Sequence, residues 1–146
     1  MHRIENYVTL EFLSRSSNES FARVAAAGFA AQLDPTLDEL GDIKTAVSEA
    51  VTTAIVHGYP DRLGKIVVKL KLLENNTLEI TVRDWGKGIE DIQQARQPMF
   101  TTGGEERSGM GFTIMESFMD RLTVKSTPGR GTTVTMRRRI SARIKR

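Results

Sequence analysis

The sequence contains no cysteine and only two histidines among its 146 residues. Without cysteine, neither a disulfide framework nor a thiolate metal site can form, and two histidines make a zinc site unexpected. Long apolar runs are also lacking, because the longest apolar region, residues 21–33, is short and is interrupted by Arg23. The N-terminus has no apolar stretch of the signal-peptide kind. These absences predict a cytoplasmic protein with no membrane contact.

Acidic residues are missing from the end of the chain. Residues 137–146 contain six cations and no acid, so the formal net charge of +3 leaves −3 on the other 136 residues. The basic character therefore belongs to the C-terminus and not to the body of the protein. We expect a single domain over residues 1–136, large enough to bury a core, and a basic tail over residues 137–146. We interpret this tail as a solvated terminus, with no direct contact to nucleic acid.

Apolar periodicity and turn signals predict an α+β fold. Capping-box patterns at Ser16 with Glu19 and at Thr36 with Glu39 mark two helix starts, and Asn75-Asn76 and residues 128–131 mark two hairpin turns. We expect strands at residues 7–12, 65–74, 77–84, 122–126 and 132–139, and helices at 17–32, at 36–57 and from 109 onward. The fold class is therefore a two-layer α/β sandwich, in which helices cover one face of a mixed, mainly antiparallel sheet.

The third predicted strand ends in Asp84-Trp85-Gly86-Lys87-Gly88. The two-residue period that points Ile80 and Val82 inward also points Asp84 inward. A buried carboxylate needs hydrogen-bond donors, which either the local chain or a ligand can supply. Gly86 and Gly88 allow the backbone to turn sharply and to approach a bound molecule closely. The alternative is a strand-ending turn capped by an aspartate.

The second predicted helix carries Glu49 and Thr53 four residues apart, beside its apolar stripe. A carboxylate and a hydroxyl one turn apart can line a polar cleft. An ordinary solvated helix flank would have the same pattern, and the helix alone does not separate the two interpretations.

The polar stretch 93–108 interrupts the pattern of strands and helices and includes Thr101-Thr102. Such a stretch suits a lid over a ligand, although a plain surface loop has the same composition. Gly109-Met110-Gly111-Phe112 follows and is predicted to open a helix. Backbone N–H groups at a helix start form a site for phosphate, and Arg107 can pair with a terminal phosphate. The pattern is neither a P-loop nor a Rossmann fingerprint.

In this order, Glu49, Asp84-x-Gly86-x-Gly88, Gly109-x-Gly111 and Gly131-Thr132-Thr133 resemble the boxes of the ATPase superfamily of gyrase, the Hsp90 chaperone, histidine kinases and MutL. Longer segments over residues 7–136 closely resemble the anti-sigma F family of spore-forming bacteria. These segments are Asn18-Glu19-Ser20-Phe21-Ala22-Arg23, Val47-Ser48-Glu49-Ala50-Val51-Thr52, His57-Gly58-Tyr59, Ala95-Arg96-Gln97-Pro98 and Arg107-Ser108-Gly109-Met110-Gly111-Phe112-Thr113-Ile114-Met115-Glu116.

The resemblance implies a Bergerat-type ATP-binding fold and an ATP-dependent serine kinase that binds and inhibits a sporulation sigma factor and phosphorylates its anti-anti-sigma antagonist. It implies Glu49 as the catalytic residue, Arg23 as a contact to protein partners, and a homodimer. It further implies ATP or ADP with Mg²⁺ as ligands. The implied ligand-binding residues are Thr53, Asp84, Gly86, Gly88, Thr101, Thr102, Arg107, Ser108, Gly109, Met110, Gly111, Phe112 and Thr132.

The sequence departs from the family at the metal. Where the family has an asparagine that binds magnesium, four residues after the glutamate, this chain has Thr53. A threonine hydroxyl can bind magnesium, but it is shorter than the amide and has a weaker dipole. An alternative to the active kinase is therefore a module that holds nucleotide and sigma factor with weakened or lost catalysis.

Overall fold

The computed structural model describes residues 2–96 and 106–141, with the backbone alone for residues 93, 94 and 106–109. Its strands are β1 (Ile4–Leu13), β2 (Lys65–Leu73), β3 (Thr77–Asp84), β4 (Arg121–Thr127) and β5 (Gly131–Arg139). Its helices are α1 (Ser17–Ala30), α2 (Leu37–Thr53), α3 (Ile92–Arg96) and α4 (Glu106–Phe118), with a short 3₁₀ turn at Ala31–Leu33 and a π-helical turn at Ala54–Gly58.

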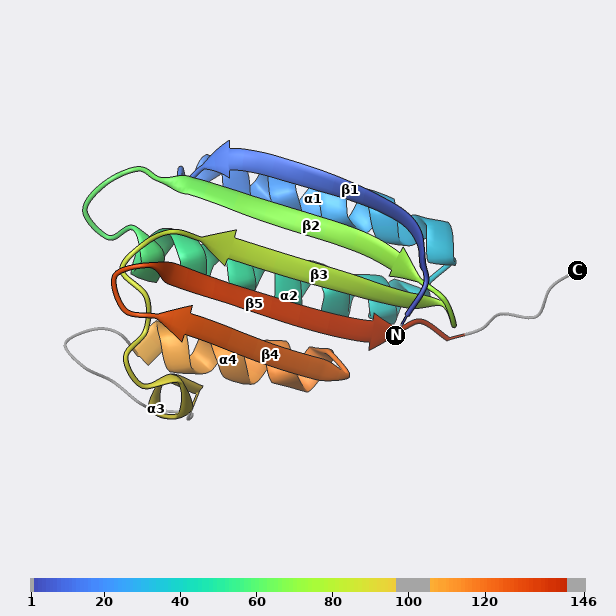
Figure 1. Cartoon of the computed structure of the whole chain (residues 1–146). Coiled ribbons are helices and arrows are strands. Elements are labelled where there is room, and N and C mark those ends of the chain that lie inside the picture. The colour runs from blue at the N-terminus through green and yellow to red at the C-terminus, as the bar shows by residue number, and fades with distance from the viewer. Residues whose placement is uncertain (1, 97–105, 142–146) are drawn as a thin grey trace, which may run out of the picture.

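The five strands form one sheet in the order β1-β2-β3-β5-β4, and all four neighbouring pairs are antiparallel. The helices α1, α2 and α4 lie behind this sheet in Figure 1, so its other face is left open. The predicted two-layer α+β class is confirmed. Among the described residues, no helix combines the length and the apolar character that crossing a bilayer requires.

The core lies between the sheet and the helices. Alternate residues of the central strands point toward the helices and are buried, as Val68, Ile80 and Met136 illustrate. The predicted apolar stripe of α2 packs onto them through Ile43, Val47 and Val51. This packing fixes α2 behind β3 and β5, with its C-terminal end beside the end of β3.

The two capping-box patterns have different outcomes. Thr36 caps α2, since its hydroxyl accepts a hydrogen bond from the Glu39 N–H and the Glu39 carboxylate accepts one from the Thr36 N–H. The Ser16 pattern is wrong as a capping box, because Ser16 is helical and makes no side-chain cap. The carboxylate of Glu19 instead pairs with Arg23 at 2.9 Å, one turn further along α1.

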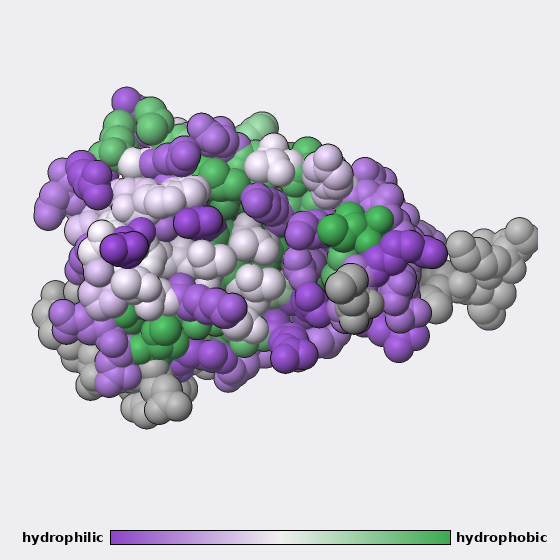
Figure 2. Space-filling model, viewed as in Figure 1, coloured by the Kyte–Doolittle hydropathy of each residue, from purple (hydrophilic) through white to green (hydrophobic). Residues whose placement is uncertain are grey.

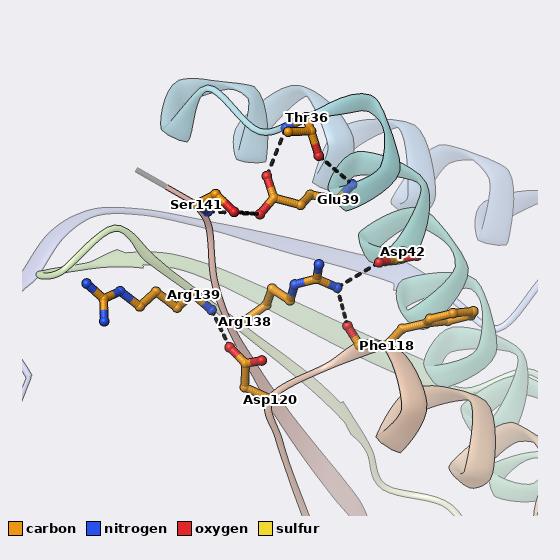
Figure 3. A network of polar contacts seen from close by, with 8 residues as sticks. All are labelled: Thr36, Glu39, Asp42, Phe118, Asp120, Arg138, Arg139 and Ser141. Carbon is orange, nitrogen blue, oxygen red and sulfur yellow. Dashed lines mark hydrogen bonds and ion pairs between the residues drawn. The ribbon is translucent and has the colours of Figure 1, made fainter. Parts of the chain in front are cut away.

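The end of β5 is fixed by a polar network that Figure 3 shows. Arg138 donates to the carboxylate of Asp42 at 2.9 Å and to the carbonyl oxygen of Phe118 at 2.6 Å. Both the N–H and the hydroxyl of Ser141 donate to Glu39. Residues 137–139, which the sequence assigns both to a predicted strand and to a basic tail, are part of the sheet, and of residues 137–146 only 142–146 lie outside the described chain.

Candidate functional site

Asp84 is the last residue of β3, and its side chain points toward the helices as the strand period predicts. It is only 5 % exposed. Burial raises the pKa of Asp84, and hydrogen bonds from the backbone of Gly86, at 2.9 Å to Oδ1, and of Thr132 offset this only in part. The carboxylate is therefore incompletely compensated by the protein itself, which favours a ligand that brings a further donor.

A cleft opens over this carboxylate at the C-terminal end of α2. It is lined on one side by residues that follow each other along α2 and its π-helical turn, and on the other by the sheet. The lining residues are Ala50, Thr53, Ala54, His57, Gly58, Val82, Asp84, Gly88, Ile89, Thr132 and Val134. Apolar walls with one buried carboxylate suit a flat heteroaromatic ring that carries an amino group.

The glycines of the Asp84 segment are needed by the protein's own backbone. A Cβ on Gly86 would lie 1.9 Å from the carbonyl oxygen of Gly58, and a Cβ on Gly58 would lie 2.8 Å from the carboxyl carbon of Asp84. Gly88 has a φ of +77° and passes close to the backbone of Thr127. The sharp turn is confirmed, but the close approach is to the chain itself, and of the two predicted glycines only Gly88 lines the cleft.

A second cleft adjoins the first and is lined by Glu49, Thr52, Thr53, Val56 and His57. Thr53 and His57 line both clefts, so the two form one continuous site along α2. Of the two interpretations left open by the sequence, the lining of a cleft therefore describes Glu49 and Thr53 better than an ordinary solvated helix flank.

Gly111 of α4 faces these two side chains. The position that a Cβ on Gly111 would take lies 3.2 Å from the Thr53 hydroxyl and 3.3 Å from Glu49 Oε1. A glycine here lets α4 come close to α2 beside the Glu49 carboxylate and the Thr53 hydroxyl. Carboxylate and hydroxyl oxygens are ligands that Mg²⁺ accepts, and Mg²⁺ takes its other ligands from water and phosphate. No group of three acidic or histidine side chains suited to a metal occurs among the described residues.

The start of α4 differs from its prediction. The helix begins at Glu106, three residues before Gly109, so Gly111 lies inside the helix and not at its first turn. The free N–H groups of a helix start belong to its first four residues, here 106–109. The side chain of Phe112 is 1 % exposed and belongs to the core, whereas Met110 is 43 % exposed.

Other predicted positions lie outside the described residues or elsewhere in the structure. Thr101 and Thr102 lie outside the described residues, as do the side chains of Arg107 and Ser108. Thr132 is directly opposite Asp84 in the sheet, and its hydroxyl shares a hydrogen bond of 2.8 Å with Ser126.

Arg23 is on α1 and lines neither of the two clefts. Its neighbours Phe21 and Val24 are 56 % and 66 % exposed. This part of α1 therefore presents exposed apolar side chains, while the Arg23 guanidinium bonds to Glu19 and Ser20.

Residue patterns alone did not single out His57, Ile89 or Tyr59. His57 follows Thr53 by four residues, and this helical spacing was the available signal. The hydroxyl of Tyr59 donates to the carbonyl oxygen of Lys65 at 2.6 Å and accepts from the N–H of Trp85 at 2.7 Å. It thus holds the segment that follows Asp84, a contact across 26 residues that no local pattern announces.

Comparison with known proteins shows the family of the chain. Residues 14–138 match the family of the histidine kinase-like ATPase domain. The chain is 58 % identical over 138 residues to the anti-sigma F factor of Thermoanaerobacter sp. (strain X514), covering 94 % of this chain and 96 % of the relative. It is 56 % identical over 139 residues to that of Geobacillus kaustophilus (strain HTA426), covering 94 % and 95 %.

Solved structures share the fold at lower identity. The RsbU and RsbW domains of a Mycobacterium tuberculosis protein align with a TM-score of 0.68 at 20 % identity, over 92 % of this chain and 32 % of that one. The blue-light activated histidine kinase EL346 of Erythrobacter litoralis aligns with a TM-score of 0.58 at 22 % identity, over 80 % and 40 %.

Proposed function

The chain belongs to the anti-sigma F factors of the histidine kinase-like ATPase domain family, and on this premise we propose that it is a cytoplasmic, ATP-dependent serine kinase that binds and inhibits a sporulation sigma factor of the sigma F type. The phosphate acceptor is a serine of its anti-anti-sigma antagonist, and the active form is a homodimer. The observation that carries the kinase proposal is the convergence of Asp84, Glu49 and Thr53 on two adjoining clefts.

The inner cleft suits adenine. Asp84 accepts a hydrogen bond from the amino group of the base, and this added donor stabilises a charge that burial disfavours. Val82, Val134 and Ala50 supply apolar contacts to the ring. Because ATP and ADP share the base, both are expected to bind.

The outer cleft suits phosphoryl transfer. ATP with Mg²⁺ supplies the transferable group and neutralises part of its charge. Glu49 orients the partner's serine hydroxyl and accepts its proton as the new serine oxygen–phosphorus bond forms and the bond from the terminal phosphorus to the bridging oxygen breaks, releasing ADP. On the family resemblance, Thr101, Thr102, Arg107, Ser108 and the backbone at the start of α4 up to Gly109 hold the phosphates, whereas residues 110–112 lie further along the helix.

Sigma binding is supported by a different part of the chain. Phe21 and Val24 are exposed and three residues apart on α1, so they form an apolar strip along the helix, and Arg23 lies on the neighbouring side, where it pairs with Glu19. A surface with exposed apolar side chains near a cation suits a protein partner. This surface does not use the nucleotide cleft directly.

A second candidate function is a nucleotide-holding sigma-binding module with weakened catalysis. The observation that favours it is the environment of Thr53, which is 8 % exposed, with Gly111 of α4 against its hydroxyl. A short, covered hydroxyl is a weaker magnesium ligand than an asparagine amide that reaches further.

Phosphorylation of a candidate anti-anti-sigma protein by labelled ATP with magnesium tests the enzyme directly. We expect transfer by the unmodified protein and a reduction of about a hundredfold in Glu49→Gln, with ADP affinity retained. Glu11→Gln, an exposed change on β1, is the matched control and should leave the rate unchanged. Equal rates for the protein and for Glu49→Gln would remove Glu49 from the mechanism.

Magnesium dependence separates the two candidate functions. Thr53→Asn restores a carbonyl ligand with little change in helix propensity, and should lower the magnesium concentration required for half-maximal transfer. Coinciding magnesium curves for the two proteins would mean that Thr53 is not the limiting ligand.

A further inference from the structure

The face of the sheet that the helices leave open carries a net positive charge, and its cations do not line the nucleotide site. Strands β2 to β5 place eight cations on it: Lys65, Lys69, Lys71, Arg83, Arg121, Lys125, Arg137 and Arg139. Glu79 is the one acid on these four strands that points the same way, so these nine residues have a formal charge of +7, and Glu11 on the edge strand β1, opposite Val67, adds one acid to the same face. The whole chain has +3, so all other residues together have −4.

Figure 2 views this open face, where hydrophilic side chains lie among paler ones across the strands. A groove of about 370 Å³ runs along β4 and β5 and is lined by Arg121, Thr123, Lys125, Thr133, Thr135 and Arg137. Its lining thus contains three cations and three hydroxyls, and no carboxylate.

The cations of the groove differ in how far they are neutralised. Arg137 pairs with Glu79 at 2.7 Å. Arg121 is directly opposite Arg137 in the β4–β5 pairing. Taken alone, such a like-charge pair destabilises the sheet. Among the described residues, neither Arg121 nor Lys125 makes a hydrogen bond or ion pair through its side chain. Two positive charges are therefore available at the two ends of the groove.

We propose that this groove binds an extended acidic segment of a partner protein, with carboxylates at alternate positions of the segment. Arg121 and Lys125 are four residues apart on β4 and so lie about 13 Å apart along the strand. An extended peptide presents side chains on one side at the same period, so acids four residues apart meet both cations. The hydroxyls of Thr123 and Thr135 lie between them and can donate to the residue in the middle.

Two other occupants fit less well. Single-stranded nucleic acid needs bare aromatic faces for base stacking. The groove has none, and the nearby Trp85 already has Lys65 and Arg83 against its ring, each 4.5 Å from the centroid. A second copy of this chain joined through the same groove by a two-fold axis would set its cations against themselves.

Fluorescence anisotropy with a short labelled peptide that carries glutamate at every second position tests the inference. Arg121→Glu/Lys125→Glu should weaken binding about tenfold or more. Arg15→Glu/Lys69→Glu is the matched control, because it makes the same change in net charge at exposed positions outside the groove. This control should weaken binding less than about threefold. ADP affinity, which depends on the other face of the sheet, reports that each variant is folded.

Several outcomes would overturn the inference. One is a failure of the unmodified protein to bind the glutamate peptide more tightly than a glutamine version. Another is equal weakening in the two double variants, which would mean that net charge alone attracts the peptide. A third is tighter, groove-dependent binding of a single-stranded DNA oligonucleotide of equal charge. A change of oligomeric state in Arg121→Glu/Lys125→Glu alone would assign the groove to a second copy of the chain.

Discussion

Two buried carboxylates lie near opposite ends of α2, and their surroundings shift their pKa values in opposite directions. Glu39, at the start of α2, is 6 % exposed, and Asp84, beside the turn that follows α2, is 5 % exposed. Burial on its own raises the pKa of both groups. At Glu39 the hydrogen bonds from Thr36 and Ser141 outweigh burial and lower the pKa to about 2. At Asp84 burial prevails and the pKa is raised.

The difference separates a structural carboxylate from one that suits a ligand. Glu39 accepts three hydrogen bonds, which join the start of α2 to the end of β5. Asp84 faces a cleft and retains accepting capacity there. Equal exposure of the residue therefore does not imply equal function. The two positions differ both in how strongly burial desolvates the carboxylate, which is more at Asp84, and in the number of donors that the protein itself supplies, which is larger at Glu39.

The largest effect on stability is expected at the satisfied carboxylate. Glu39→Gln removes the charge that three donors compensate, and should lower the free energy of unfolding at pH 7 by about 3 kcal/mol. Urea denaturation measures this, with Glu11→Gln on the exposed side of β1 as the control. A loss below about 1 kcal/mol would contradict the assigned role of Glu39.

The same contrast predicts opposite pH dependences. The folded pKa of Glu39 is about 2 against 4.5 ordinarily, so its stabilisation is present above pH 4.5 and is lost as the pH falls toward 2. The pKa of Asp84 is raised, so ionising it reduces stability as the pH rises above 3.8. Urea denaturation of Glu39→Gln and of the unmodified protein should thus converge as the pH is lowered from about 5 to 3. A constant difference over this range would contradict the prediction.

A smaller effect is expected from two glycine substitutions. Gly28→Ala in α1 meets no atom within 4 Å and should raise stability by up to about 1 kcal/mol through helix propensity. Gly111→Ala gains the same propensity but crowds Thr53 and Glu49, so its net change should be smaller and ADP affinity in the presence of magnesium should fall. Thermal unfolding and calorimetry measure both quantities. An equal gain in stability with unchanged affinity in both variants would remove Gly111 from the site.

Local sequence patterns predicted the fold class, the strand pairing of both hairpins and the inward direction of Asp84. They succeeded where period and turn chemistry act within a few residues, as at Asn75-Asn76, where both residues have positive φ as a tight hairpin turn requires.

What failed depended on competition or on distant partners. Ser16 and Thr36 carry the same capping pattern, but Arg23 takes the carboxylate of Glu19 and leaves Ser16 without its reciprocal bond. The π-helical turn at Ala54–Gly58, which brings Gly58 against Asp84, has no local signature distinct from the helix before it. The contact of Ser141 with Glu39 spans 102 residues, so no local pattern indicates that the chain stays attached to the domain beyond the predicted strand 132–139.

Titration calorimetry with ADP on Asp84→Asn and Glu39→Gln tests the central claim most directly. If the buried carboxylate with the raised pKa is the one that receives the base, Asp84→Asn should lose affinity by about tenfold or more, because a hydrogen bond to a charged group is lost. Glu39→Gln should be less stable but bind ADP with unchanged affinity under conditions where it is folded. Retained ADP affinity in Asp84→Asn, or an equal loss in the two variants, would contradict the account.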